Sequence, residues 1–257
     1  MMVAIGIVIG VMIGFTGLGS GSLLTPLLIL FGGLSPAAAV GTSLTFAMLT
    51  KTFGAFNFVR RGMVKMDIIR DLSTGGLPGV LLGAFVIRYL GLRKPDVINV
   101  LLLRAIGATL IVVSLVMLWR LFPEKMRPAA IDRRLEISDG WRRALIILVG
   151  FVTGLVVTVT SIGSGAALIP AMVLFYRLES GVLVGTNVAM GAILAAIASI
   201  SHMGLGNVNW PSVALLLCGS LPGIWIGSQF HGRIHRAIPE GAIALALFAM
   251  GVQIIIS

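Results

Sequence analysis

The chain has 257 residues, of which 58% are hydrophobic and only 11% are charged, with 19 Lys and Arg against 9 Asp and Glu. A typical soluble domain carries roughly a quarter charged residues. Residues 1–50 and 180–231 contain no Lys, Arg, Asp or Glu at all. This composition excludes a soluble enzyme and a disordered chain, and the single Cys218 supports neither a disulfide scaffold nor a Cys-based metal site.

Ten apolar segments follow one another along the chain, in two sets of five. The first set is 3–18, 21–33, 36–59, 68–91 and 96–119, and the second is 145–162, 165–176, 180–203, 211–232 and 239–256. The last three of each set are long enough to cross a bilayer, whereas the first two are short. Each short pair is either a hairpin or one broken span, so we expect an all-α polytopic membrane protein with about 8–10 transmembrane segments.

The two sets form an internal repeat with an offset of 144 residues. Gly41-Thr42 falls on Gly185-Thr186, and Pro26 falls on Pro170. Gly and Pro mark backbone geometry, so their register predicts two copies of one fold. The expected organisation is a first transmembrane repeat at 1–118, a cytoplasmic polar connector at 119–143 and a second repeat at 144–257. Two such units are typical of secondary transporters.

The positions of the basic residues predict the orientation. If the connector is cytoplasmic, 14 of the 19 Lys and Arg lie on the cytoplasmic side, and only Arg88, Arg93 and Lys94 lie outside. Such an excess is what the positive-inside rule requires, and the same count makes the two repeats inverted if each short pair is a hairpin; a single crossing by each short pair would make them parallel. The positive charge therefore indicates a multi-pass protein of the cell inner membrane, with the lipid bilayer and not nucleic acid as its partner. A homo-oligomer stays open.

A break rich in Gly and Ser interrupts each short pair. An interrupted helix in lipid needs protein or a water-filled cavity to satisfy its backbone, and its free N–H groups can bind an anion. We expect the two breaks to face each other near the middle of the membrane; close helix packing by small residues is the alternative. The candidate substrate-binding residues of the breaks are Thr16, Gly19, Ser20, Gly21, Ser22, Ser161, Gly163, Ser164 and Gly165.

A second repeated motif pairs Thr42-Ser43 with Thr186-Asn187, about one turn into the long helices that follow. These side chains are candidate contacts for an oxyanion, with hydrogen bonding between helices as the alternative. Lys51 has no basic counterpart, because Ala195 stands at the equivalent position. A Lys within a span faces a cavity, where it would contact an anion, or snorkels to the membrane surface.

Other chemistry is poorly supported by the sequence. His202 is read as a packed neutral side chain, with a proton relay as the alternative. The carboxylates lie near the ends of the predicted spans, and no phosphate-binding loop, metal-ligand cluster or catalytic triad is found. We therefore expect no enzymatic activity, no cofactor and no metal site.

These motifs together resemble the sulfite exporter TauE/SafE family. The resemblance rests on 17–26 (GLGSGSLLTP), 39–44 (AVGTSL) and 60–64 (RRGMV), with a weaker second copy at 161–165 (SIGSG) and 184–187 (VGTN). It covers nearly the whole chain except the connector. The sequence departs from the family's Gly-Ile-Gly-Gly-Gly type of first break at Ser20 and Ser22, and Lys51 is a cation that the general pattern does not require.

The resemblance implies a permease for small sulfur-containing anions, such as sulfite or organosulfonates, often in the exporting direction. The residues themselves lead to a two-repeat anion transporter that works by alternating access, but not to sulfur. An anion channel and a non-transporting membrane anchor or assembly subunit are the alternatives.

Overall fold

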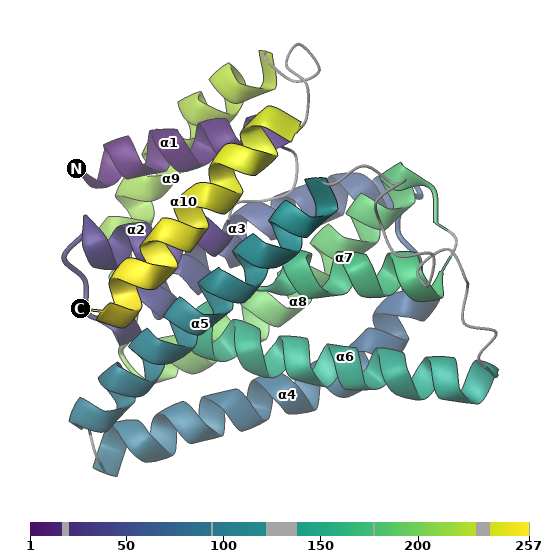
Figure 1. The fold of residues 1–257 in the computed structure, drawn as a ribbon, viewed down its shortest axis with the longest axis horizontal. Coiled ribbons are helices and arrows are strands. Elements are labelled where there is room, and N and C mark those ends of the chain that lie inside the picture. The colour runs from purple at the N-terminus through teal and green to yellow at the C-terminus, as the bar shows by residue number, and fades with distance from the viewer. Residues whose placement is uncertain (17–20, 94, 122–137, 177, 230–236, 257) are drawn as a thin grey trace.

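The computed structural model describes residues 1–16, 21–93, 95–121, 138–176, 178–229 and 237–256, and in these ranges it contains ten helices (Figure 1). The first repeat forms α1 (Met2–Thr16), α2 (Gly21–Leu30), α3 (Pro36–Arg60), α4 (Met66–Arg93) and α5 (Pro95–Leu121). The second forms α6 (Asp139–Thr160), α7 (Ser164–Phe175), α8 (Ser180–Gly204), α9 (Trp210–Gln229) and α10 (Ala237–Ile256). The all-helical prediction and the order of the segments are confirmed.

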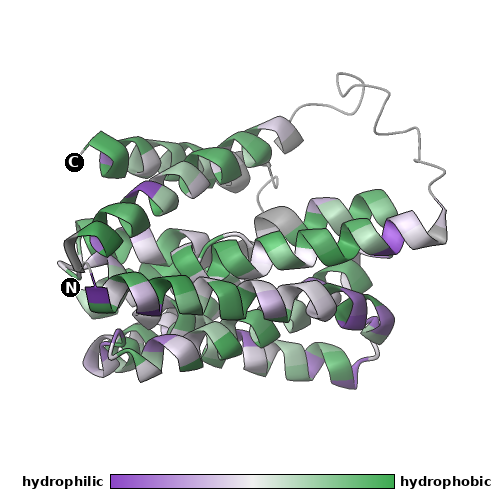
Figure 2. Ribbon diagram, turned by 90° about the horizontal axis from the view of Figure 1, so that it is seen from below, coloured by the Kyte–Doolittle hydropathy of each residue, from purple (hydrophilic) through white to green (hydrophobic). Residues whose placement is uncertain are grey.

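Five of the described helices are long and apolar enough to cross a membrane, namely α4, α5, α6, α8 and α9. Figure 2 shows apolar residues along most of the helices and hydrophilic residues mainly toward the ends of the bundle. The protein is therefore a multi-pass membrane protein. The helices α3 and α10, also expected as spans, are not among these five, and the apolar stretch of α10 is the shorter Gly241–Ile256.

Helix α6 is longer than the apolar segment that predicted it. It begins at Asp139 and not at residue 145, so it takes in charged residues that were assigned to the connector. Tertiary contacts hold this polar first part in place. The Arg143 Nε lies 3.0 Å from Asp71 Oδ1 on α4, and the Arg142 guanidinium lies 5.5 Å from the centre of the Tyr176 ring.

Local sequence explains where the long helices begin and end. Ser35 caps α3, where its side chain accepts a hydrogen bond from the Ala38 N–H at 3.4 Å and Pro36 follows at the first helical position. Gly62 and Gly206, at φ of 68° and 72°, turn the chain in the left-handed region after α3 and α8. These two glycines are equivalent in the repeat, so both long helices end in the same way.

Helices of the two repeats pack against each other in pairs. Helix α1 lies along α9, α4 along α6, α5 along α10 and α3 along α8 (Figure 1). Backbone approaches backbone in two of these pairs. A β-carbon on Gly75 of α4 would collide with the carbonyl of Ile147 on α6, and one on the equivalent Gly219 of α9 with the carbonyl of Val3 on α1. The two sequence repeats are thus interleaved and are not separate bodies.

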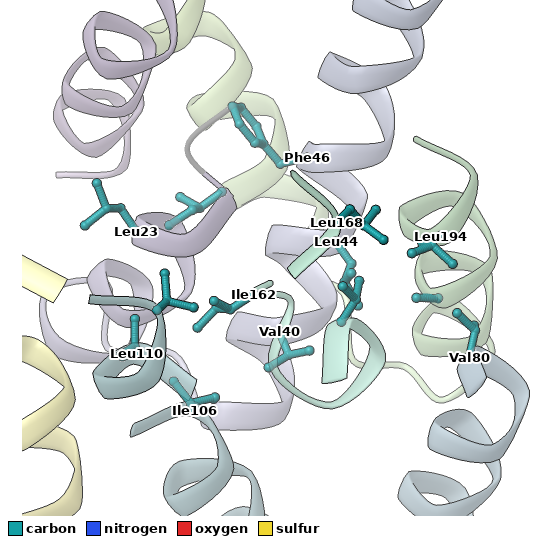
Figure 3. Packing of buried hydrophobic residues seen from close by; sticks show 14 of the residues in the cluster. Leu23, Val40, Leu44, Phe46, Val80, Ile106, Leu110, Ile162, Leu168 and Leu194 are labelled. Atoms are coloured by element: carbon teal, nitrogen blue, oxygen red, sulfur yellow. The ribbon is translucent and has the colours of Figure 1, made fainter. Parts of the chain in front are cut away.

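The short helices α2 and α7 lie in the interior of this bundle. Leu24 and Leu28 of α2, and Leu168 and Met172 of α7, are fully buried. Figure 3 shows Leu23 of α2, Ile162 and Leu168 of the second short pair and Leu44 of α3 within one hydrophobic cluster. The second break, which precedes α7, therefore leads into the core of the protein.

Candidate functional site

The second break has the backbone geometry that the sequence predicts. Helix α6 ends at Thr160. Its C-cap Ser161 is a non-glycine residue in the left-handed region at φ 61°, and Gly163 at φ 114° precedes α7. Gly163 offers no side-chain cap, so the first N–H groups of α7 have no side-chain acceptor from the N-cap position. Ser161 is buried, and its hydroxyl has no hydrogen-bond partner among the described residues.

The first break is described only in part. Gly19 and Ser20 lie outside the described residues. Thr16 is the last residue of α1 and Gly21 the first of α2, while Ser22 is half-buried in the first turn of α2. In the second break, Ser164 is the first residue of α7. The roles of these residues in binding stay predictions.

Thr42 and Thr186 form equivalent hydrogen bonds between the two repeats. The Thr42 hydroxyl accepts a hydrogen bond from the backbone N–H of Asn209 at 3.1 Å, and the Thr186 hydroxyl accepts one from the backbone N–H of Lys65 at 3.1 Å. Residues 65 and 209 are themselves equivalent, so each repeat holds the loop of the other. Both threonines are fully buried, and each retains its own O–H for one further bond.

Ser43 and Asn187, the neighbours of these threonines, differ from them in hydrogen bonding. Both side chains are buried, with exposed fractions of 1% and 4%. In the described part of the chain, the Ser43 Oγ and the Asn187 Oδ1 have no hydrogen-bond partner. Buried polar atoms without a partner are rare, because each costs free energy that water would otherwise supply. The two positions are equivalent in the repeat, and their role in binding stays a prediction.

Asn187 lies beside the second break. A β-carbon built on Gly165, in the first turn of α7, would be 3.8 Å from the Asn187 Nδ2. The amide thus borders the N-terminal turn of α7, where backbone N–H groups and the helix dipole favour negative charge. The structure brings together Asn187 and Gly165, which the sequence placed in two separate motifs.

Helices α3 and α8 run antiparallel, and this places the polar residues at different levels. Thr45 Oγ1 is 2.8 Å from Ser199 Oγ, while Gly54 approaches Val188, so residue numbers rise on one helix as they fall on the other. The crossing is centred near residues 49–50 and 193–194. At 1.5 Å per residue, Ser43 lies about 10 Å from this centre toward one end, and Asn187 about 10 Å toward the other.

These contacts place Ser43 and Asn187 on two different levels of the bundle. Lys51 lies within about 3 Å of the centre measured along α3 and is half-buried. The candidate contacts therefore follow one another along the helices, with the Lys51 level between those of Ser43 and Asn187. These candidate contacts therefore lie at three levels along α3 and α8 and do not form a single cluster.

His202 is fully buried on α8, near the level of Ser43. Its Nε2 lies 3.0 Å from the carbonyl oxygen of Thr158, which can only accept, so Nε2 carries the proton. This arrangement agrees with the reading of a packed neutral histidine. The sequence analysis did not select Thr25 of α2 and Thr153 of α6, which are buried with unpaired hydroxyls in the described residues. A lone Thr inside an apolar run was their only signal.

The chain matches known membrane proteins over its length. The profile described as sulfite exporter TauE/SafE matches residues 2–254. "Probable membrane transporter protein YjnA" of Bacillus subtilis (strain 168) is 32% identical over 99% of this chain and 98% of its own length. "Probable membrane transporter protein YunE" of the same organism is 26% identical over 99% of this chain and 96% of its own length. No solved structure gives a significant match.

Proposed function

Because the chain belongs to the sulfite exporter TauE/SafE family, we propose that it is a secondary transporter that exports small sulfur-containing anions such as sulfite or organosulfonates. The observation that carries the proposal is the approach of the Asn187 Nδ2, an amide donor, to the first turn of α7, together with the buried Ser43 hydroxyl at the equivalent position, which has no hydrogen-bond partner among the described residues. Asn187 borders the uncapped N-terminal turn of α7. Neutral donors at a helix N-terminus suit a small oxyanion, because they bind it without a buried counter-charge.

The levels along α3 and α8 suggest an order of events. An anion that enters from the cytoplasm first meets Asn187, Gly165 and the N-terminal turn of α7. Lys51 lies midway between these two levels. Its positive charge would lower the free-energy cost of moving an anion past lipid and apolar side chains. Ser43 then receives the anion at the far level. Lys51 is the one basic side chain in this proposed row.

Alternating access needs parts that move as units. The close backbone contacts of α1 with α9 and of α4 with α6 favour each of these pairs as one unit. Each pair takes one helix from each repeat, so the moving bodies that we propose do not coincide with the two sequence repeats. The short helices α2 and α7 pack between them, where a shift of either pair would change access to the polar residues.

The proposal is tested with the purified protein in liposomes and labelled sulfite inside. We expect sulfite efflux that Asn187→Leu and Gly163→Leu abolish, while Ser201→Ala on the same helix as Asn187 leaves it unchanged. High, uncoupled conductance would indicate an anion channel. No flux of sulfite or of any tested organosulfonate by folded protein would contradict transport and favour an anchor or assembly subunit.

A further inference from the structure

A cavity of about 320 Å³ opens at the end of the bundle where α3 begins and α4 ends. Its lining includes Ser35, Arg88, Asn99, Leu205 and Asn207, which come from the start of α3, the end of α4, the start of α5 and the loop after α8. The volume falls at the lower end of the range for small-molecule sites, about 300–1,000 Å³. We call this space, with these residues, the Arg88 cavity.

The lining of the Arg88 cavity has the chemistry of an anion site. The guanidinium of Arg88 is a planar cation with several donors that match two oxygens of one oxyanion. Asn99 and Asn207 add amide donors and Ser35 adds a hydroxyl, and no carboxylate is among the described residues that line the cavity. The walls also include the buried Ile87 and Ile98, which lower the local dielectric and strengthen the attraction.

Asn207 is held firmly in this wall. Its backbone N–H donates to the carbonyl of His202 at 3.0 Å, and its own carbonyl lies against Gly41 of α3. A side chain on a fixed backbone loses less freedom when it binds a ligand, so the amide is well placed to contact an anion.

The repeat provides an internal comparison. The contacts around the loops are equivalent at the two ends of the bundle, but the residues of the Arg88 cavity are not. The positions equivalent to Ser35, Asn99 and Asn207 are Glu179, Ile243 and Met63, which place a carboxylate and two apolar side chains where the cavity has donors. At these three positions the hydroxyl and amide donors therefore belong to one end only, and the shared fold does not require them.

We propose that the Arg88 cavity binds a small oxyanion at the predicted extracellular end of the protein. Its occupant carries a sulfite, sulfonate or phosphate group, either as a free anion that leaves the protein or as the headgroup of an anionic lipid. The free-anion form rests on the proposed function, because the cavity lies beyond the Ser43 level on the exit side. An anion site there explains why Arg88 occurs on the predicted outer side, where the positive-inside rule leaves few basic residues.

The test measures equilibrium binding of labelled sulfite, kept under argon, to the purified protein in detergent. Arg88→Gln, Arg88→Lys and Arg93→Gln are compared in the natural chain and in the Asn187→Leu background. Arg93 is the matched control, because it stacks on Tyr89 at 4.6 Å near the same end but does not line the cavity. Size-exclusion profiles verify that each variant is folded.

We expect Arg88→Gln to weaken sulfite binding at least tenfold in both backgrounds, Arg88→Lys to retain it within about threefold, and Arg93→Gln to change it less than twofold. Equal effects of Arg88→Gln and Arg93→Gln, or no effect of either on the binding of both sulfite and anionic lipid, would overturn the proposal. A parallel native mass measurement counts bound phosphatidylglycerol against phosphatidylethanolamine. If Arg88→Gln removes phosphatidylglycerol and leaves sulfite binding intact, the anion site stands and its occupant is the lipid headgroup.

The outcomes separate this inference from the proposed function. Sulfite flux in liposomes without any Arg88-dependent binding contradicts the Arg88 cavity alone. Binding that depends on Arg88 without flux contradicts transport and leaves the anion site in place.

Discussion

The hydroxyl of Thr42 on α3 accepts a hydrogen bond from the backbone N–H of Asn209, at the start of α9, across 3.1 Å. The equivalent residues Thr186 and Lys65 make the same bond at the same distance. Each repeat therefore makes the same hydrogen bond to the loop of the other repeat. The offset of 144 residues in the sequence thus corresponds to an exchange of contacts in space.

These two hydrogen bonds should contribute equally to stability. Thr42→Val or Thr186→Val removes the acceptor of a part-buried hydrogen bond, whose net contribution to stability is about 0.5–1.5 kcal/mol. We expect both variants to lower the midpoint of thermal unfolding in detergent by several degrees, while Thr42→Ser and Thr186→Ser retain the natural value. A shift in only one of the two valine variants would contradict the equivalence.

Ser43 and Asn187 should matter for transport and not for stability. Their buried oxygens have no partner in the described residues, so Ser43→Ala or Asn187→Leu removes no hydrogen bond to them. We expect an unchanged or slightly raised unfolding midpoint together with a loss of sulfite flux of at least tenfold. Ser199→Ala is the contrast, because Ser199 bonds to Thr45 at 2.8 Å, and this variant should lose stability. Destabilisation by Asn187→Leu would argue for a structural role.

Lys51 should be required for anion flux. Replacing it with Met removes the positive charge midway along α3, so an anion would cross that level without compensation. We expect Lys51→Met to reduce sulfite efflux at least tenfold and Lys51→Arg to restore most of it. The control is Arg60→Gln on the same helix, where Arg60 lies 4.3 Å from the centre of the Phe56 ring at the helix end. An equal loss with Arg60→Gln would show a general charge effect.

The glycines that bring α4 to α6 and α9 to α1 should not tolerate a side chain. Gly75→Ala and Gly219→Ala place a β-carbon against the carbonyls of Ile147 and Val3, so the helices must move apart. We expect both variants to lose folded monomer on size-exclusion chromatography. Gly91→Ala on α4 meets nothing within 4 Å and should be neutral or stabilising by up to about 1 kcal/mol. Folded protein at natural yield for Gly75→Ala would refute the close approach.

The predicted orientation can be tested by cysteine labelling in a Cys218→Ser background. Position 31 precedes α3, and position 92 lines the Arg88 cavity. Positions 140 and 180 lie at the starts of α6 and α8, and the Arg143–Asp71 contact lies at this end of α6. We expect a membrane-impermeant thiol reagent outside the cell to label 31 and 92, and to reach 140 and 180 only after permeabilisation. Labelling of 31 and 140 from the same side would refute the inverted arrangement.

The sequence alone determined the membrane class, the order of the helices and the repeat. Long runs without charge admit few structures other than spans, and Gly and Pro in register constrain the backbone wherever they recur. It also located the second break, because Ser161 and Gly163 adopt left-handed backbone where a helix cannot continue. The start of α6 was missed by six residues, since its first turns are polar and are held by Asp71 and Tyr176 from elsewhere in the chain.

Only the tertiary structure decided which residues of the motifs meet. Thr42 and Ser43 are neighbours in sequence, yet one hydroxyl bonds a loop of the other repeat and the other is left unpaired, because adjacent residues on a helix face different neighbours. The antiparallel crossing of α3 and α8 separated Ser43 from Asn187 and placed Lys51 at a level between them. Asn207 lies far along the chain from Arg88 and Asn99, and only the packing of helix ends brings the three around one cavity.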